Sequence, residues 1–163
     1  MGNNSVAIGP NSVANGDNSV AMGNGAVTTT TATNALAMGT SATASAANSV
    51  ALGSNSNVSA NNSVALGANS VADGSTLSNA AYNPGGSVAG VTPVGEVSVG
   101  SAGAERRITN VAAGSAPTDA VNVSQLQALK SSVNTDIKEL KGGIAAALAL
   151  ESAPSVAGKF TTY

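Results

Sequence analysis

The stretch of sequence that decides the fold is Asn48-Ser-Val-Ala-Leu-Gly53. The same motif, with small changes, recurs along the first half of the chain at residues 4–9, 18–23, 34–39 and 62–67. The closing glycines lie 14 residues apart, except for one step of 16 residues. Weaker copies begin at Asn11 and Asn69, each seven residues after the start of a full copy. A repeat of fixed period predicts a solenoid, and here one coil contains two seven-residue units.

Each copy predicts a short β-strand followed by a tight turn. In a strand, alternate side chains point to opposite sides, so Val6 and Ile8 share one face and Ala7 lies on the other. The Gly and Asn residues between the strands adopt positive φ at low cost, which suits turns. About five stacked coils would form a rod roughly 24 Å long. The two extra residues of the 16-residue step fall in Val27–Thr31, where we expect a bulge at one corner.

The alternation also predicts which side chains fill the head. We expect the larger apolar side chains to form the interior of the coils: Val6, Ile8, Val13, Val20, Met22, Leu36, Met38, Val50, Leu52, Val64 and Leu66. The opposite face carries Ala with Ser beside most of them, whereas a solvated strand face usually carries polar or charged side chains. We therefore expect this face to pack against another chain through Ala7, Ala21, Ala37, Ala51 and Ala65.

The composition excludes several classes of protein. Only 9% of the 163 residues are charged and 2% are aromatic, and the chain has no Cys, His or Trp, whereas globular proteins average about 25% charged residues. Without His and Cys, the usual metal ligands and the commonest general base are missing, so we expect no enzyme activity, no metal and no cofactor. The net charge of −2 and the pI near 4.8 argue against nucleic-acid binding. A flexible Gly/Ser/Asn linker is disfavoured because linkers do not hold Val and Leu in a fixed register.

The distribution of charge divides the chain into two regimes. Before Glu96 the only charged side chains are Asp17 and Asp73. The Gly- and Pro-rich stretch from Leu77 to Val97 argues against regular structure, and a short strand is expected at Val97–Gly100. The predicted organisation is a head of repeats at 1–76, a loop region at 77–117, a coiled-coil stalk at 118–143 and a further segment at 144–163 that begins with small apolar residues.

The stalk is predicted from a periodic stripe of apolar residues. Thr118 is expected to cap a helix after Pro117, with Asp119 in its first turn. Spacings of three and four residues define a coiled-coil seam with one stutter, formed by Leu126, Leu129, Val133, Ile137, Leu140 and Ile144. A single surface helix packed on its own domain is the alternative, but no other amphipathic element is present to receive the stripe. The adjacent Gly142 and Gly143 weaken a helix, so we expect it to end there.

Together with the head repeats, three further motifs resemble the trimeric autotransporter adhesins of Gram-negative bacteria. These motifs lie at 97–100, 105–114 and 118–126. The resemblance implies a mainly β chain with a C-terminal helix: a left-handed parallel β-roll head packed as a trimer at 1–76, a loop and neck at 77–117, a trimeric coiled-coil stalk at 118–143 and the start of a membrane-anchor region at 144–163. In the neck it implies ion pairs between chains, or solvated charges, at Glu105, Arg106, Arg107 and Asp119, with Glu96 as a further partner. It also implies that 142–163 begins the membrane anchor, with Gly158–Tyr163 opening the first strand of a barrel whose other strands are absent.

The function implied is that of a surface adhesin. The expected partners are two further copies of the chain, a host extracellular-matrix or cell-surface ligand of unknown identity, and the outer membrane through the missing barrel. The alternative is a structural spacer near the membrane, with adhesion carried elsewhere in a larger protein. An ice- or glycan-binding solenoid is a third class, suggested by Thr28–Thr31 but disfavoured because Thr clusters on one coil only.

Overall fold

The structure is a computed structural model, and it describes residues 1–151. The chain divides into two units, one from Met1 to Thr109 and one beginning at Asn110. The expected barrel-opening strand at Gly158–Tyr163 lies outside the described residues, as does most of the expected anchor region.

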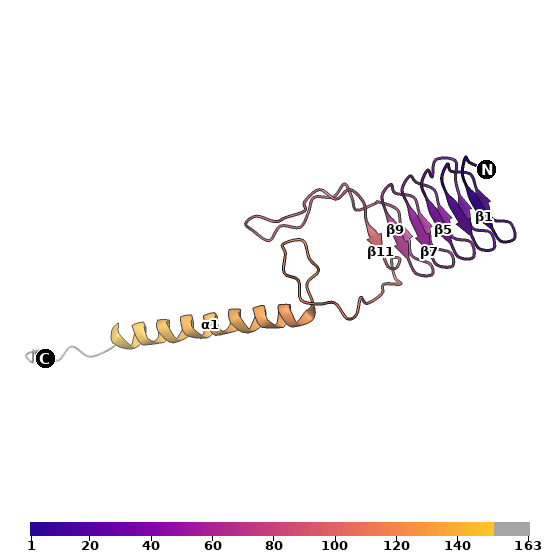
Figure 1. Cartoon of the computed structure of the whole chain (residues 1–163). Helices are drawn as coiled ribbons and strands as arrows, with labels where there is room; N and C mark the ends of the chain where they lie inside the picture. The colour runs from indigo at the N-terminus through magenta and orange to yellow at the C-terminus, as the bar shows by residue number, and fades with distance from the viewer. Residues whose placement is uncertain (152–163) are drawn as a thin grey trace, which may run out of the picture. The chain divides into compact units, whose positions relative to one another are not determined.

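The first unit is a parallel β-solenoid built from two sheets (Figure 1). Sheet A contains β1 (Val6–Ile8), β3 (Val20–Met22), β5 (Leu36–Met38), β7 (Val50–Leu52), β9 (Val64–Leu66) and β11 (Val97–Ser98). Sheet B contains β2 (Val13–Ala14), β4 (Val27–Thr28), β6 (Thr43–Ala44), β8 (Asn57–Val58) and β10 (Val71–Ala72). Each coil contributes one strand to each sheet, and equivalent residues of successive repeats pair, as in Val50 with Val64. The predicted solenoid is therefore confirmed.

The turns between strands follow the predicted chemistry. The non-glycine residues at the corners have φ between 52° and 59°, and all but one are Asn: Asn4, Asn11, Asn18, Asn34, Ser41, Asn48, Asn55, Asn62 and Asn69. Asn adopts this left-handed conformation more easily than most residues, so the repeated Asn positions set the corners. The 16-residue step enlarges the corner after β4, where the Thr29 and Thr31 hydroxyls donate to the Ser45 carbonyl oxygen at 3.2 and 2.9 Å.

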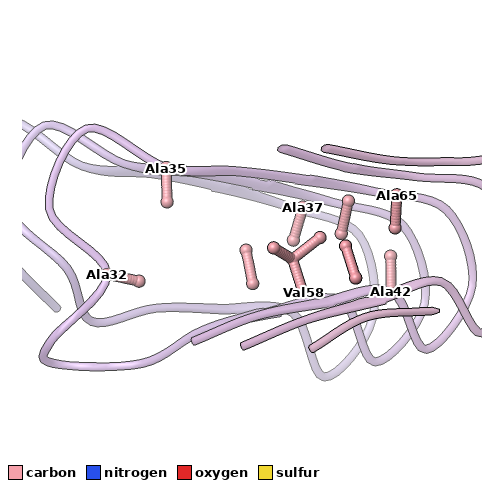
Figure 2. Close-up of a cluster of buried hydrophobic side chains, with 9 residues drawn as sticks. Ala32, Ala35, Ala37, Ala42, Val58 and Ala65 are labelled. Carbon is pink, nitrogen blue, oxygen red and sulfur yellow. The ribbon is translucent and has the colours of Figure 1, made fainter. Parts of the chain in front are cut away.

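The interior of the coils is filled by small side chains, which corrects the predicted assignment of the two faces. Figure 2 shows Ala37, Ala65 and Val58 pointing into the space between the two sheets. The alanines expected to face another chain are the core instead, since Ala21, Ala37, Ala51 and Ala65 are fully buried and Ala7 is half-buried at the first coil. The side chains expected in the core point outward, half-buried or exposed: Val6, Ile8, Val13, Val20, Met22, Leu36, Met38, Val50, Leu52, Val64 and Leu66.

The physical reason for this inversion is the small volume inside each coil. Two strands of two or three residues, joined by tight corners, leave room only for Ala, Ser, Thr and the single Val58. Buried hydroxyls are satisfied locally: Ser19 and Ser49 each donate to the carbonyl oxygen three residues earlier, both at 2.6 Å. Among the described residues, every buried side-chain polar atom has a hydrogen-bond partner. A polar, small-residue interior of this kind costs little because its hydrogen bonds are made.

The strand predicted at Val97 belongs to the head and lies beyond the expected boundary at residue 76. In sheet A, β11 pairs with β9, and Val97 lies opposite Val64. These partners are 33 residues apart, whereas Val50 and Val64 are 14 apart. The extra residues form an insertion loop, residues 74–95, which leaves the solenoid after β10 and returns at β11 (Figure 1).

The second unit contains one helix, α1 (Val123–Glu151). The expected cap at Thr118 is wrong, because Asn122 caps the helix: its side-chain oxygen accepts from the Gln125 backbone N–H, and the Gln125 side-chain oxygen accepts from the Asn122 N–H, both at 3.2 Å. This reciprocal pair is a capping box. The helix also continues through Gly142 and Gly143, contrary to the expectation that it ends there. Within the described chain, no helix combines the length and hydrophobicity that crossing a bilayer requires.

We expect Asn122→Ala to destabilise the helical unit by about 1 kcal/mol, the usual value for losing an Asn cap. The variant removes the acceptor for Gln125 and the 3.2 Å bond from the Asn122 amide to the Val111 carbonyl oxygen. Thermal unfolding followed by circular dichroism at 222 nm is the measurement. Asn134→Ala is the matched control in the middle of the helix, and it should leave stability unchanged or slightly raised because Ala favours helix. Equal destabilisation by both variants would contradict the capping role.

Candidate oligomerisation and binding surfaces

The outward side of sheet A carries two parallel rows of large apolar side chains. We call these the outer rows of sheet A: Val6, Val20, Leu36, Val50, Val64 and Val97 in one, and Ile8, Met22, Met38, Leu52 and Leu66 in the other. Within one chain they are incompletely covered, and Ile8 keeps 50% of its surface exposed. The parallel register of the strands aligns these side chains into continuous stripes along the solenoid.

Such stripes are costly to leave in water. Fully burying one Val, Leu, Ile or Met side chain contributes about 1.5–3 kcal/mol. Large contiguous apolar patches on a soluble surface usually mark interaction sites. The sequence predicted that the alanine face would be covered by another chain. The outer rows of sheet A, and not the alanine face, have the properties of such a surface.

Sheet B presents a different outward face. Its outer row has one residue per coil: Val13, Val27, Thr43, Asn57 and Val71. This row mixes apolar with uncharged polar side chains and carries no charge. It is a mixed surface that tolerates solvent better than the outer rows of sheet A.

The two acidic residues that precede the insertion loop, Asp17 and Asp73, are held by backbone groups. Asp17 accepts from the Asn3 N–H at 2.7 Å, which joins adjacent coils. Asp73 accepts from the Ser75 N–H at 2.9 Å, and this hydrogen bond lowers the pKa of Asp73 below its ordinary value. Both carboxylates therefore serve turns and coil edges, which leaves the outward rows of both sheets uncharged.

Arg106, expected in the neck, closes the last coil of the solenoid. Its guanidinium donates to the carbonyl oxygens of Val99 and Ala68 and to the Ser70 hydroxyl. The bond to Val99 is 2.6 Å long and that to Ser70 is 3.0 Å. These contacts were not foreseen, because the sequence alone does not show that residue 106 returns to the turn at residues 68–70.

The acidic residues named for the neck also accept from backbone groups within the chain. Glu105 accepts from the Gly103 N–H at 2.8 Å, and backbone hydrogen bonds lower the pKa of Glu105. In the second unit, Asp119 accepts from the N–H groups of Ala116 and Ser115, both at 2.9 Å, and these bonds lower the pKa of Asp119. Ion pairs between chains at these residues and Arg107 remain a prediction.

The seam of α1 is exposed along the length of the described helix. Each of its members keeps at least 43% of its surface in contact with solvent in the single chain: Leu126, Leu129, Val133, Ile137, Leu140 and Ile144. A long helix whose apolar stripe packs on nothing among the described residues has the pattern of one strand of a coiled coil. Like the outer rows of sheet A, the seam is therefore a candidate surface for association with another chain.

No group of three or more His, Cys, Asp or Glu side chains within residues 1–151 is placed to hold a metal ion. The features with recognisable geometry are surfaces: the outer rows of sheet A, the outer row of sheet B, the insertion loop and the seam.

Two family matches cover most of the described chain. Residues 2–26, 31–56, 47–70 and 59–75 match the YadA head domain repeat, and residues 107–149 match the coiled stalk of trimeric autotransporter adhesin. Residues 76–106, which contain most of the insertion loop, fall outside both matches.

Individual proteins show the same similarity. The chain is 45% identical over 73 residues to the autotransporter adhesin EhaG of Escherichia coli O157:H7, and 49% identical over 74 residues to the autotransporter adhesin BtaE of Brucella suis biovar 1 (strain 1330). These alignments span 43% and 44% of this chain but only 5% and 9% of the two relatives. A solved structure, the collagen-binding domain of the Yersinia adhesin YadA, matches with a TM-score of 0.56 and 35% identity, over 80% of this chain and 69% of that one.

Proposed function

The chain belongs to the YadA-like trimeric autotransporter adhesins, and from this premise we propose that it is a homotrimeric, non-enzymatic adhesin segment displayed on the surface of a Gram-negative bacterium. Its head would attach the cell to host extracellular matrix, with the helix as part of the stalk. Three copies on one stalk would convert weak single contacts into avidity.

The main support for a trimer is that apolar surface is left exposed at two separate places in the chain. The outer rows of sheet A and the seam are both apolar and continuous, and the described chain leaves both incompletely covered. Association of three chains would bury each of these surfaces. This assignment replaces Ala7, Ala21, Ala37, Ala51 and Ala65 as the contact between chains, because those side chains belong to the interior of the coils.

The surfaces left free in such a trimer support a neutral protein ligand. With sheet A turned toward the other chains, the outer row of sheet B and the insertion loop stay in solvent, and neither carries a charged side chain. The Yersinia domain that resembles this chain is described as collagen-binding. We propose triple-helical collagen as the matrix ligand of this head.

We expect the full chain to bind immobilised type I collagen, measured by surface plasmon resonance. Because the free surfaces are almost uncharged, affinity should change by less than about threefold between 0.05 and 0.5 M NaCl, conditions under which surface charge interactions are strongly screened. Heat-denatured collagen is the matched control for the triple helix and should bind less. Affinity that collapses at high salt would contradict recognition by the neutral surfaces.

A second candidate is a purely structural spacer. It is favoured by the small share of the two relatives that the chain spans, 5% and 9%, because the remaining length leaves room for adhesion elsewhere. A chain that is trimeric but binds no native collagen in this assay would support the spacer and contradict the adhesive head.

A further inference from the structure

We propose that the insertion loop, residues 74–95, is a protein-binding finger that contacts a proline-rich triple helix through the Tyr82 ring. This inference deepens the proposed collagen-binding function and rests on it. It assigns recognition to a segment outside the solenoid repeats and outside both family matches.

The base of the insertion loop is fixed to the last coil. The Glu96 carboxylate accepts from the Gly74 N–H at 2.7 Å, and the Glu96 N–H donates to the Ser63 hydroxyl at 3.0 Å. The Asn62 amide donates to the Val94 carbonyl oxygen at 3.4 Å. At Gly95, the backbone passes so close to Asn62 that a Cβ would lie 2.2 Å from its carbonyl oxygen, so only Gly fits. The two ends of the loop are thus anchored together on the solenoid.

The outer part of the insertion loop is exposed and closes in a defined turn. Between residues 75 and 94 only Leu77 and Val88 are partly covered. At the tip, the Asn83 side chain accepts from the Gly85 N–H at 2.9 Å and donates to the Gly86 carbonyl oxygen at 3.1 Å. The side chain of Tyr82, beside this turn, keeps 87% of its surface exposed. The structure therefore presents its one described tyrosine on a hydrogen-bonded turn.

The composition of the insertion loop suits a protein partner. It carries no charged side chain and consists mainly of Ser, Thr, Asn, Gly, Pro and small apolar residues around one Tyr. Binding loops of antibodies share this mixture, since Tyr gives a large rigid contact area and Ser, Gly and Asn give adaptable hydrogen bonds. Nucleic acid, sulfated glycan and anionic membrane all require basic side chains, which the loop lacks.

Two further features favour a proline-rich rod over a neutral glycan. Val91 and Val94 of the same loop are exposed, at 52% and 84%, and aliphatic side chains pack on apolar protein surface. Collagen chains are extended polyproline II helices, and proline-rich helices of this kind dock on aromatic side chains because their preformed backbone loses little entropy on binding. The Tyr82 hydroxyl makes no hydrogen bond within the described chain, so it is available to a carbonyl oxygen of such a partner.

The test compares the unmodified full chain with Tyr82→Ala and Tyr82→Phe on immobilised type I collagen. We expect Tyr82→Ala to weaken the apparent affinity at least about tenfold, as for an aromatic hot spot, and Tyr82→Phe to stay within about threefold because it keeps the ring. Trimer mass and melting temperature, measured in parallel, should be unchanged in both variants.

Each other result has a definite meaning. If the unmodified chain binds and Tyr82→Ala binds equally well, the finger is wrong while the adhesive head stands. If the unmodified chain binds no collagen, the proposed ligand and the finger both fail. If Tyr82→Ala lowers the melting temperature or mass of the trimer, the ring packs between chains and the proposal is overturned.

Discussion

Introducing charge on the outer rows of sheet A, by Met38→Asp with Leu52→Asp, is expected to abolish the trimer of the head. These side chains lie on the outward side of β5 and β7, opposite each other in the parallel register. If the outer rows meet near a common axis, the double variant buries up to six carboxylates together, and each unpaired buried charge costs several kcal/mol. We expect the apparent dissociation constant to rise by at least about 1,000-fold. Analytical ultracentrifugation measures the change.

The matched control places the same two charges on the outward face of sheet B. Thr43→Asp with Asn57→Asp alters β6 and β8, whose outward residues lie opposite each other in sheet B. This variant should keep the mass of the unmodified chain. If the sheet B variant dissociates and the sheet A variant does not, the two faces have been assigned the wrong way round.

The second large effect is expected from Gly53→Ala, which should destabilise the head by at least about 3 kcal/mol and lower its melting temperature by on the order of 10 °C. Gly53 has φ of 134°, a conformation that L-residues rarely adopt. A Cβ there would lie 2.5 Å from the carbonyl carbon of Gly67 in the next coil. Because the atoms in the way are backbone, two coils would have to separate. Thermal unfolding of the full chain is the measurement.

Gly85→Ala separates the two causes of this effect. Gly85 has a similar φ of 127°, but nothing lies within 4 Å of the position its Cβ would take. It therefore reports the cost of backbone conformation without the clash between coils, and its effect should be much smaller. Equal loss of stability in the two variants would contradict close stacking as the reason for Gly53.

The sequence was sufficient to predict the solenoid because its period and its turn residues agree. The spacing of Asn48 and Asn62 gives the register of β7 and β9, and every repeated Asn corner has the expected positive φ. The seam of α1 was predicted from spacing in the same way, and its residues are uncovered in the single chain. Local periodicity is a strong signal because each repeat has to satisfy the same geometry.

The direction of the two strand faces could not be obtained from alternation alone. Alternation shows that Val50 and Leu52 share a side and that Ala51 lies on the other, but not which side faces inward. The usual rule places the larger apolar residues inside, and here it fails because the coil is too narrow for them. The absence of charge on both faces was the available clue that neither is simply solvated.

Contacts between residues far apart in the sequence could not be predicted from the repeat pattern either. Arg106 reaches Ser70, and Glu96 holds Gly74, over separations of 36 and 22 residues. The helix cap is different, because Asn122 followed three residues later by Gln125 and then by an apolar run is a recognisable capping box. This capping box is a stronger signal for the start of the helix than Pro117 and Thr118 are.

In the proposed trimer, two further copies close the apolar surfaces that one chain leaves open. Sedimentation equilibrium of the unmodified chain tests this most directly. We expect a single species of about 46 kDa, three times the chain mass of 15.4 kDa, that persists on dilution. A single species with the mass of one chain, folded and monodisperse, would contradict it.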